Sequence, residues 1–533
     1  MVTDEQPLSR REAREAGGPA PSRPPRQKRQ PRAPRRESTA APAEAAPVLV
    51  DENGKPITPK GGILGVIRKH PTAWLFSALA VAFVLMGTGA VFAGVAYASQ
   101  PDDAAAAPEE TQLPPRPQPS TEPTSVVLRT CSVNTFASDP RLMSLAGSVL
   151  RADTGEQLYS FHSISAQRTG SVLKVLTASA AIEQLGADFQ ITTSVVTGST
   201  AGSIVLIGRG DATLSAMPAG TESVYSGAPK LSSLASAVIS KYQATFPGQP
   251  ITQLVLDSSY WNSSDKWDPS WKRSEQKIGY HSEVTALQVD GDRKDPTKQT
   301  SPRSTDPVSR AGKLFLDALR AADPGGVVDP GLSVTTGTSA GGTTLATVKS
   351  QPVRVLIKQM LLNSDNTIAE MLARIVSREA GLGGTAASLQ QAIPSALWPD
   401  DPETASRVVI KDGSGLSENN GVPAQVMADF MRRIQAGAGN LDLVRDALPV
   451  AGKTGTLAGR FTGDNAVVRG HVTAKTGWID TAYTLSGFMD AADGTELTFA
   501  FYAIGAGIKD NAKEALDTLV RGVYTCGDNL ANF

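Results

Sequence analysis

The chain has 533 residues, a formal net charge of −1 and a hydrophobic share of 40%, which is enough apolar material for a large core and allows two or three domains. The charges are unevenly placed, because Arg and Lys crowd residues 1–70 and the remainder is correspondingly acidic. Residues 1–70 are also rich in Pro and Ala and almost lack aromatic side chains, which excludes a packed core there. We interpret them as a disordered cytoplasmic tail. A nucleic-acid-binding tail is the alternative, but we expect no nucleic acid as a partner.

A strongly apolar span at residues 71–98 follows the basic tail and is long enough to cross a bilayer as a helix. Arg68 and Lys69 precede it and acidic residues follow it, so the positive-inside rule places the N-terminus in the cytoplasm and the later residues outside. Ala96-Tyr97-Ala98 also resembles a signal-peptide cleavage site, which is the alternative. The span is long for a signal peptide, which favours an uncleaved single-pass anchor in the cell membrane.

A Pro-rich stretch at residues 99–127 predicts an extended linker between the membrane and a folded region. Two cysteines, Cys131 and Cys526, flank that folded region on the expected outer side, where disulfides persist. A disulfide between them would tie the two ends of the domain together. Two unrelated free thiols are the alternative, and nearby histidines for a metal role are lacking.

The folded region predicts an α+β or α/β fold, with an antiparallel sheet between helices. Its two parts, residues 128–186 and 346–533, are separated by residues 187–345, whose short strands and turns predict an inserted accessory domain rich in β structure. The expected strands are 145–151, 157–161, 191–196, 203–207, 252–256, 472–476, 484–489 and 497–502, and the expected helices are 171–185, 353–362, 367–380 and 510–523.

The first chemically informative motif is Ser171-Val172-Leu173-Lys174, an S-x-x-K tetrad where a helix is expected to begin. Residues three apart share one helix face, so the lysine amine can lie beside the serine hydroxyl. A serine becomes a useful nucleophile only when a neighbour takes its proton, and lysine can do so where burial or a nearby cation lowers its pKa. Alone, the tetrad is a weak signal, because S-x-x-K arises by chance in most long chains, and a helix cap with a surface lysine would be the better interpretation.

The second motif is Ser364-Asp365-Asn366, between two expected helices. Here the serine hydroxyl can relay a proton, and the asparagine amide can hold a substrate carbonyl or steady the lysine. As an isolated tripeptide it would indicate only a turn or a helix cap.

The third motif is Lys475-Thr476-Gly477, on an expected edge strand, where the lysine and threonine can receive a substrate carboxylate and the glycine leaves room for the substrate. The same tripeptide also occurs as Lys453-Thr454-Gly455. We favour the second copy, because a strand pattern approaches it and a hairpin follows it, whereas a turn-rich stretch follows the first.

The order S-x-x-K, S-D-N, K-T-G is typical of serine acyl enzymes that act on D-Ala peptides or β-lactams. Over about residues 140–525 the chain resembles the D-alanyl-D-alanine carboxypeptidase/endopeptidase family, the class C low-molecular-mass penicillin-binding proteins. The long interval between Ser171 and Ser364 also fits this family, which inserts accessory domains there. Further similar stretches are residues 207–214 (with Ala212 in place of the usual proline), 257–260 with Trp267 and Trp271, and 412–417.

The resemblance implies the penicillin-binding-protein/β-lactamase-like serine transferase fold and a catalytic domain formed by the two outer parts. It implies that Ser171 attacks the D-Ala-D-Ala carbonyl, that Lys174 takes its proton, and that the backbone N–H groups of Ser171 and Trp478 form the oxyanion hole. Ser364 and Lys475 would then pass a proton to the leaving D-Ala. The expected partners are peptidoglycan stem peptides, with β-lactams as covalent inhibitors, and neither a metal nor an organic cofactor is implied.

One residue departs from the family pattern, since Trp478 stands where a small or hydroxyl residue usually follows K-T-G. Its backbone N–H remains, but its ring can narrow the cleft. Two other functions stay open at this point: another enzyme with the same motifs, such as a β-lactamase or a transpeptidase, and a catalytically weak envelope sensor that binds β-lactams. The long insertion argues against a β-lactamase, and the intact motifs argue against a sensor.

Overall fold

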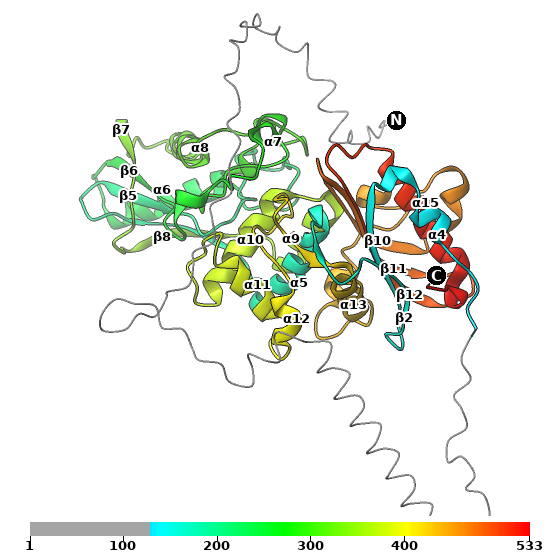
Figure 1. Cartoon of the computed structure of the whole chain (residues 1–533). Coiled ribbons are helices and arrows are strands. Elements are labelled where there is room, and N and C mark those ends of the chain that lie inside the picture. Colours follow the sequence, from blue (N-terminus) through cyan, green and yellow to red (C-terminus); the bar gives the residue numbers. More distant parts are fainter. Residues whose placement is uncertain (1–127, 533) are drawn as a thin grey trace, which may run out of the picture. The chain divides into compact units, whose positions relative to one another are not determined.

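The computed structural model describes residues 128–532 (Figure 1). The tail, the membrane span and the linker predicted at residues 1–127 lie outside the described residues. Within residues 128–532, the helices are all too short or too polar to serve as a membrane span.

The central sheet brings together strands from both ends of the described chain. Its five strands run in the order β10-β11-β12-β1-β2, and every neighbouring pair is antiparallel. The strands are β1 (Ser144–Arg151), β2 (Gln157–Phe161), β10 (Val472–Ile479), β11 (Ala482–Asp490) and β12 (Glu496–Ile504). Strand β10, which carries the second K-T-G copy, is therefore an edge strand.

Helices cover both faces of this sheet because its strands alternate their side chains between two apolar cores. On β12, Phe499 and Phe501 enter a core with α15 (Ala512–Cys526), whereas Ala500 and Tyr502 enter the core of the larger helical layer. Figure 1 shows α15 and the short α4 (Asn134–Ala137) on one side of the sheet and the larger helical layer on the other. That layer contains α5 (Lys174–Leu185), α9 (Val353–Asn363), α10 (Asn366–Glu379), α11 (Leu389–Leu397), α12 (Pro402–Ser406), α13 (Ala424–Gln435) and α14 (Asp442–Arg445).

A second, mixed sheet lies in the inserted region, with the order β7-β6-β5-β4-β8. The β5–β6 and β6–β7 pairs are parallel, and β4 pairs antiparallel with β5 and β8. Helices α6 and α8 share an apolar core with this sheet. The elements are β4 (Thr192–Thr197), β5 (Ser203–Ile207), α6 (Leu231–Thr245), β6 (Ile251–Asp257), α7 (Arg273–Ile278), α8 (Pro307–Ala321), β7 (Val328–Thr336) and β8 (Thr344–Lys349). A two-stranded pair, β3 (Ala166–Gln167) and β9 (Val422–Pro423), completes the strands of residues 128–532.

The structure differs from the sequence prediction in several places, and helices α11 and α13 and strands β7 and β8 are among the elements that were not predicted. Helices α6 and α8 were not expected, although the buried residues of α6 (Leu231, Leu234, Ala235, Val238, Ile239 and Tyr242) have helical spacing. The expected boundary at residue 345 falls inside β8, so the second sheet ends only at Lys349. The helix expected from Ser171 begins with a 3₁₀ turn, Gly170–Leu173, and α5 proper starts at Lys174.

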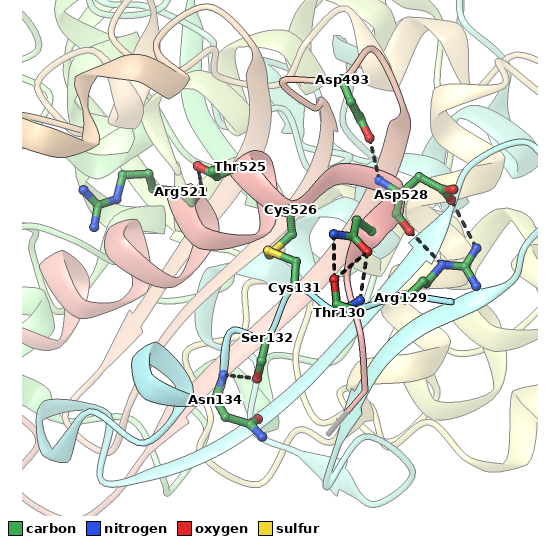
Figure 2. Close-up of a disulfide and its surroundings, with 11 residues drawn as sticks. Arg129, Thr130, Cys131, Ser132, Asn134, Asp493, Arg521, Thr525, Cys526 and Asp528 are labelled. Atoms are coloured by element: carbon green, nitrogen blue, oxygen red, sulfur yellow. Dashed lines mark hydrogen bonds and ion pairs between the residues drawn. A yellow bond between two sulfur atoms is a disulfide. The ribbon is translucent and has the colours of Figure 1, made fainter. Parts of the chain in front are cut away.

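The two ends of the described region are tied together covalently (Figure 2). Cys131 and Cys526 form a disulfide across 395 residues of sequence, with their Cα atoms 5.5 Å apart. Beside it, the backbone N–H of Cys131 donates to Asn529 O at 3.0 Å, and the Arg129 guanidinium contacts the Asp528 carboxylate at 3.1 Å. The first described residues therefore lie against the end of α15 and the segment that follows it.

Candidate active site

Ser171 and Lys174 lie together at the start of the buried helix α5. The Lys174 side chain is completely buried, and its Nζ lies 2.8 Å from Ser171 Oγ. The same Nζ donates to Asn366 Oδ1 at 2.7 Å and to the backbone oxygen of Ser414 at 2.7 Å. Because the first turn is 3₁₀, residues three apart stand directly above one another, which brings the amine and the hydroxyl into contact.

Ser364 and Asn366 lie at the junction between α9 and α10. Ser364 ends α9 in the left-handed conformation, with φ 54° and ψ 40°. Asp365 caps α10, because its carboxylate accepts from the backbone N–H of Ile368 at 3.1 Å. Asn366 is the first residue of α10, and its Nδ2 donates to Tyr280 O at 3.1 Å while its Oδ1 contacts Lys174. The junction thus places the Asn366 amide against Lys174 and puts Ser364 in the lining of the same cleft as Ser171.

Lys475 comes to this junction from the edge strand β10. Its side chain is fully buried, and its Nζ donates to Ser364 Oγ at 3.0 Å and to Thr476 O at 2.8 Å. Lys453, of the other K-T-G copy, is exposed and lies in the loop before the 3₁₀ turn Gly455–Leu457. Among the predicted lysines, the structure therefore brings Lys174 and Lys475 into one site and leaves Lys453 outside it.

Two glycines allow the turn that carries Ser171 to approach β10 closely. A Cβ added to Gly477 would lie 2.5 Å from Thr169 O and 3.0 Å from Ser171 N. A Cβ added to Gly170, whose φ is +50°, would lie 2.9 Å from Trp478 N. The backbone N–H groups of Ser171 and Trp478 therefore belong to two segments in close contact. The Trp478 ring is half-buried and packs beside Tyr483, with ring centroids 6.1 Å apart.

A cleft of about 610 Å³ opens over these groups. One wall comes from the inserted region and the other from β10, the loop around the first K-T-G copy, and the start of α15. The lining includes Ser171, Tyr280, Arg293, Gln299, Arg303, Ser364, Asp365, Gly455, Thr456, Arg460, Thr476, Gly477, Trp478, Tyr483, Asp510 and Lys513. Ser171 is thus accessible from a cleft large enough for a peptide end.

The turn at residues 412–415, whose Ser414 backbone oxygen accepts from Lys174, had no role assigned from the sequence. Glu370 Oε1 accepts the backbone N–H groups of Gly413 at 3.0 Å and Ser414 at 2.8 Å. Asp412 accepts the backbone N–H of Gly415 at 2.7 Å. Burial, and then the nearby Asp412 carboxylate, raises the pKa of Glu370 to about 7. Glu370 follows Asn366 by one helical turn, so the spacing could have indicated that both face the site.

The family model of the D-Ala-D-Ala carboxypeptidase 3 (S13) family matches residues 130–299 and 287–523. The chain belongs to this family. It is 31% identical over 480 residues to carboxypeptidase DacB of Mycolicibacterium smegmatis, which covers 86% of this chain and 99% of the relative. It is also 32% identical over 407 residues to a carboxypeptidase of Mycobacterium tuberculosis, which covers 75% of this chain and 84% of the relative.

The fold comparison agrees with the family assignment. Penicillin binding protein 4 of Haemophilus influenzae matches with a TM-score of 0.60 at 18% identity, over 75% of this chain and 99% of that one. A second structure of that protein, with a TM-score of 0.55, is a complex with a β-lactam. The predicted family, fold class and enzyme class are thus confirmed: this S13 protein is a serine-type D-Ala-D-Ala carboxypeptidase with a penicillin-binding-protein fold.

Proposed function

We propose that this S13 carboxypeptidase hydrolyses D-Ala-terminated stem peptides of peptidoglycan through an acyl intermediate on Ser171. The observation that carries the proposal is the contact of 2.8 Å between Lys174 Nζ and Ser171 Oγ, at the base of an open cleft. The Lys174 side chain is fully buried, which is the condition under which an amine can act as a base. In the acylation step, Lys174 takes the hydroxyl proton as Ser171 Oγ attacks the penultimate D-Ala carbonyl.

The negative charge that develops on the carbonyl oxygen requires donors fixed in advance. We assign this role to the backbone N–H groups of Ser171 and Trp478, on the strength of the close approach at Gly170 and Gly477. The terminal carboxylate of the substrate would lie against Lys475 and Thr476. The contact between Lys475 Nζ and Ser364 Oγ supports a proton route from the site to the leaving D-Ala amine. Water then attacks the acyl ester and releases Ser171.

The location of the enzyme follows from its substrate and from residues 1–127. We propose that residues 71–98 anchor the chain in the cell membrane and that residues 99–127 let the catalytic region reach the wall outside. The disulfide at Cys131 and Cys526 supports an oxidising compartment. Protease treatment of intact cells tests this: the catalytic region should be cleaved without lysis, and protection until lysis would contradict an outer location.

Matched variants of the two K-T-G copies test the assignment of the site. The full chain, Lys475→Ala and Lys453→Ala are incubated with a fluorescent penicillin and then with a D-Ala-D-Ala peptide, and labelling and free D-Ala are measured. We expect Lys453→Ala to behave as the parent, because its side chain is exposed and outside the cleft. Lys475→Ala should lose labelling and release by about 10²-fold or more. Equal losses in the two variants would contradict the assignment.

The same assay separates the enzyme from a sensor. The half-buried Trp478 ring lines the cleft and is the observation that favours a sensor. Labelling without D-Ala release from any peptide would support the sensor, whereas release in proportion to labelled protein supports hydrolysis.

A further inference from the structure

Arg293 is the residue of the inserted region that forms an ion pair with the catalytic junction. Arg293 Nη2 contacts Asp365 Oδ2 at 2.8 Å, and both side chains are almost completely buried, with exposed fractions of 1% and 2%. Asp365 is the residue between Ser364 and Asn366. The ion pair lies at the edge of the cleft, since both partners also line it.

The Asp365 carboxylate is held from two sides. Its Oδ2 also accepts from the Tyr225 hydroxyl at 3.1 Å and from Gln299 Nε2 at 3.2 Å, both in the inserted region. Its Oδ1 accepts from the backbone N–H of Ile368 in α10. The Arg293 guanidinium keeps the pKa of this buried carboxyl below its ordinary value, although burial alone would raise it. An ionised carboxylate is therefore clamped between α10 and the insertion.

The turn that presents Arg293 has three consecutive positive φ angles. Asp290, Gly291 and Asp292 have φ values of 53°, 57° and 60°, a region that non-glycine residues rarely adopt, although Asp does so more readily than most. The turn is fixed by its surroundings: Asp290 Oδ2 accepts the backbone N–H of Ala216 at 3.0 Å, and Asp292 Oδ2 accepts that of Ser304 at 2.8 Å. Uncommon backbone conformations that their surroundings hold in place cluster at functional sites, which supports a functional role for this turn.

The residue next to Asp365 is strained as well. Ser364 has φ 54°, and its hydroxyl must point at Lys475 Nζ, 3.0 Å away. A serine keeps this conformation only when its neighbours hold it. Asp365 follows Ser364 directly in the chain, so the ion pair with Arg293 fixes the residue next to it.

We propose that Arg293 is a positioning residue for acyl transfer: through Asp365 it holds the Ser364 hydroxyl against Lys475, so that acylation of Ser171 depends on the inserted region. The inference rests on the proposed function, since it assumes that Ser364 and Lys475 act in acylation. It assigns the insertion a role in the chemistry of the site.

Removal of Arg293 alone leaves a buried carboxylate unpaired and endangers folding, so the decisive variant is Arg293→Met/Asp365→Asn. Both charges are then absent, while the asparagine oxygen can still cap α10. In the full chain we expect this double variant to recover most of the thermal stability that Arg293→Met loses. Its acylation rate constant with a fluorescent penicillin should stay at least about tenfold below the parent, with unchanged non-covalent affinity, because Ser364 is no longer held in place.

The matched control is Arg374→Met, which breaks another ion pair between α10 and the insertion, Arg374 to Asp265 at 2.8 Å. Arg374 does not line the cleft, so its loss should lower stability but leave the acylation rate constant within about threefold of the parent. A double variant that acylates as fast as the parent would overturn the proposal. Arg293 would then serve only to neutralise the charge of Asp365. A parent chain that is not acylated at Ser171 would instead overturn the proposed function.

Discussion

The backbone oxygen of Ser414 lies 2.7 Å from Lys174 Nζ, on a turn whose N–H groups are bound by Glu370. Lys174, the proposed general base, is therefore positioned by a backbone carbonyl 240 residues away in the sequence. Through this turn, the position of the lysine beside Ser171 depends on two buried carboxylates, those of Glu370 and Asp412.

Lys174→Met removes the amine while keeping an unbranched side chain of similar length. We expect the rate of acylation by penicillin to fall by about 10²–10⁴, the usual contribution of a general base. Circular dichroism should show a folded chain. Acylation at more than a tenth of the parent rate would contradict the role of Lys174.

Glu370→Gln tests the carboxylate that holds the Ser414 turn. The folded-state pKa of Glu370 is raised to about 7, so between its unfolded value and pH 7 the folded state binds more protons than the unfolded state. This group therefore destabilises the fold as the pH rises from the unfolded-state pKa of Glu370 toward its folded-state pKa.

Glutamine can accept the same two N–H groups and cannot ionise. We expect Glu370→Gln to gain stability relative to the parent between pH 5 and pH 8, measured by urea unfolding at each pH. A constant difference between the two proteins across this range would contradict the raised pKa.

Two variants test separately how acylation depends on the backbone of the oxyanion hole and on the Trp478 ring. Gly477→Ala disturbs the backbone, and Trp478→Thr removes the ring. A Cβ at position 477 would lie 2.5 Å from Thr169 O and 3.0 Å from Ser171 N, so the alanine should push β10 away and lower acylation by about 10²-fold or more. Trp478→Thr keeps the backbone N–H and should acylate within about threefold of the parent. The stopped-flow rate with penicillin measures both, and the reverse order would contradict the oxyanion-hole assignment.

Cys131→Ser/Cys526→Ser removes the bond that closes a sequence separation of 395 residues. We expect the free energy of unfolding to fall by about 2–5 kcal/mol, because the unfolded chain regains freedom. Acylation at 25 °C should not change, because neither cysteine lines the cleft. The parent treated with a reductant should reproduce the loss, and a parent insensitive to reduction would contradict the stabilising role.

Local patterns were sufficient to predict much of this fold. Strand β2 was expected at its observed bounds, and Gly186 stops α5 as predicted. Ser171 and Lys174 could be paired because three-residue spacing brings side chains together in any helical turn. Helix α6 was missed although its apolar positions have helical spacing, because its four serines favour turns and helix caps.

The long-range contacts of the site could not be predicted from short sequence motifs. The two K-T-G copies could be ranked only by the strand pattern around Lys475. Nothing in the sequence near Asp365 shows that Arg293 reaches it from the insertion. Nor does the sequence show that Gly170 must lack a side chain because Trp478 N lies beside it. Such contacts depend on how distant segments pack, which a single sequence does not reveal.

The acyl intermediate itself is the most direct test. The full chain is treated with benzylpenicillin, digested and examined by mass spectrometry beside Ser171→Ala. The proposed mechanism predicts one penicilloyl adduct, on the peptide that contains Ser171, which disappears in the alanine variant and decays as hydrolysis proceeds. An adduct on another residue, or an equal adduct in Ser171→Ala, would contradict it.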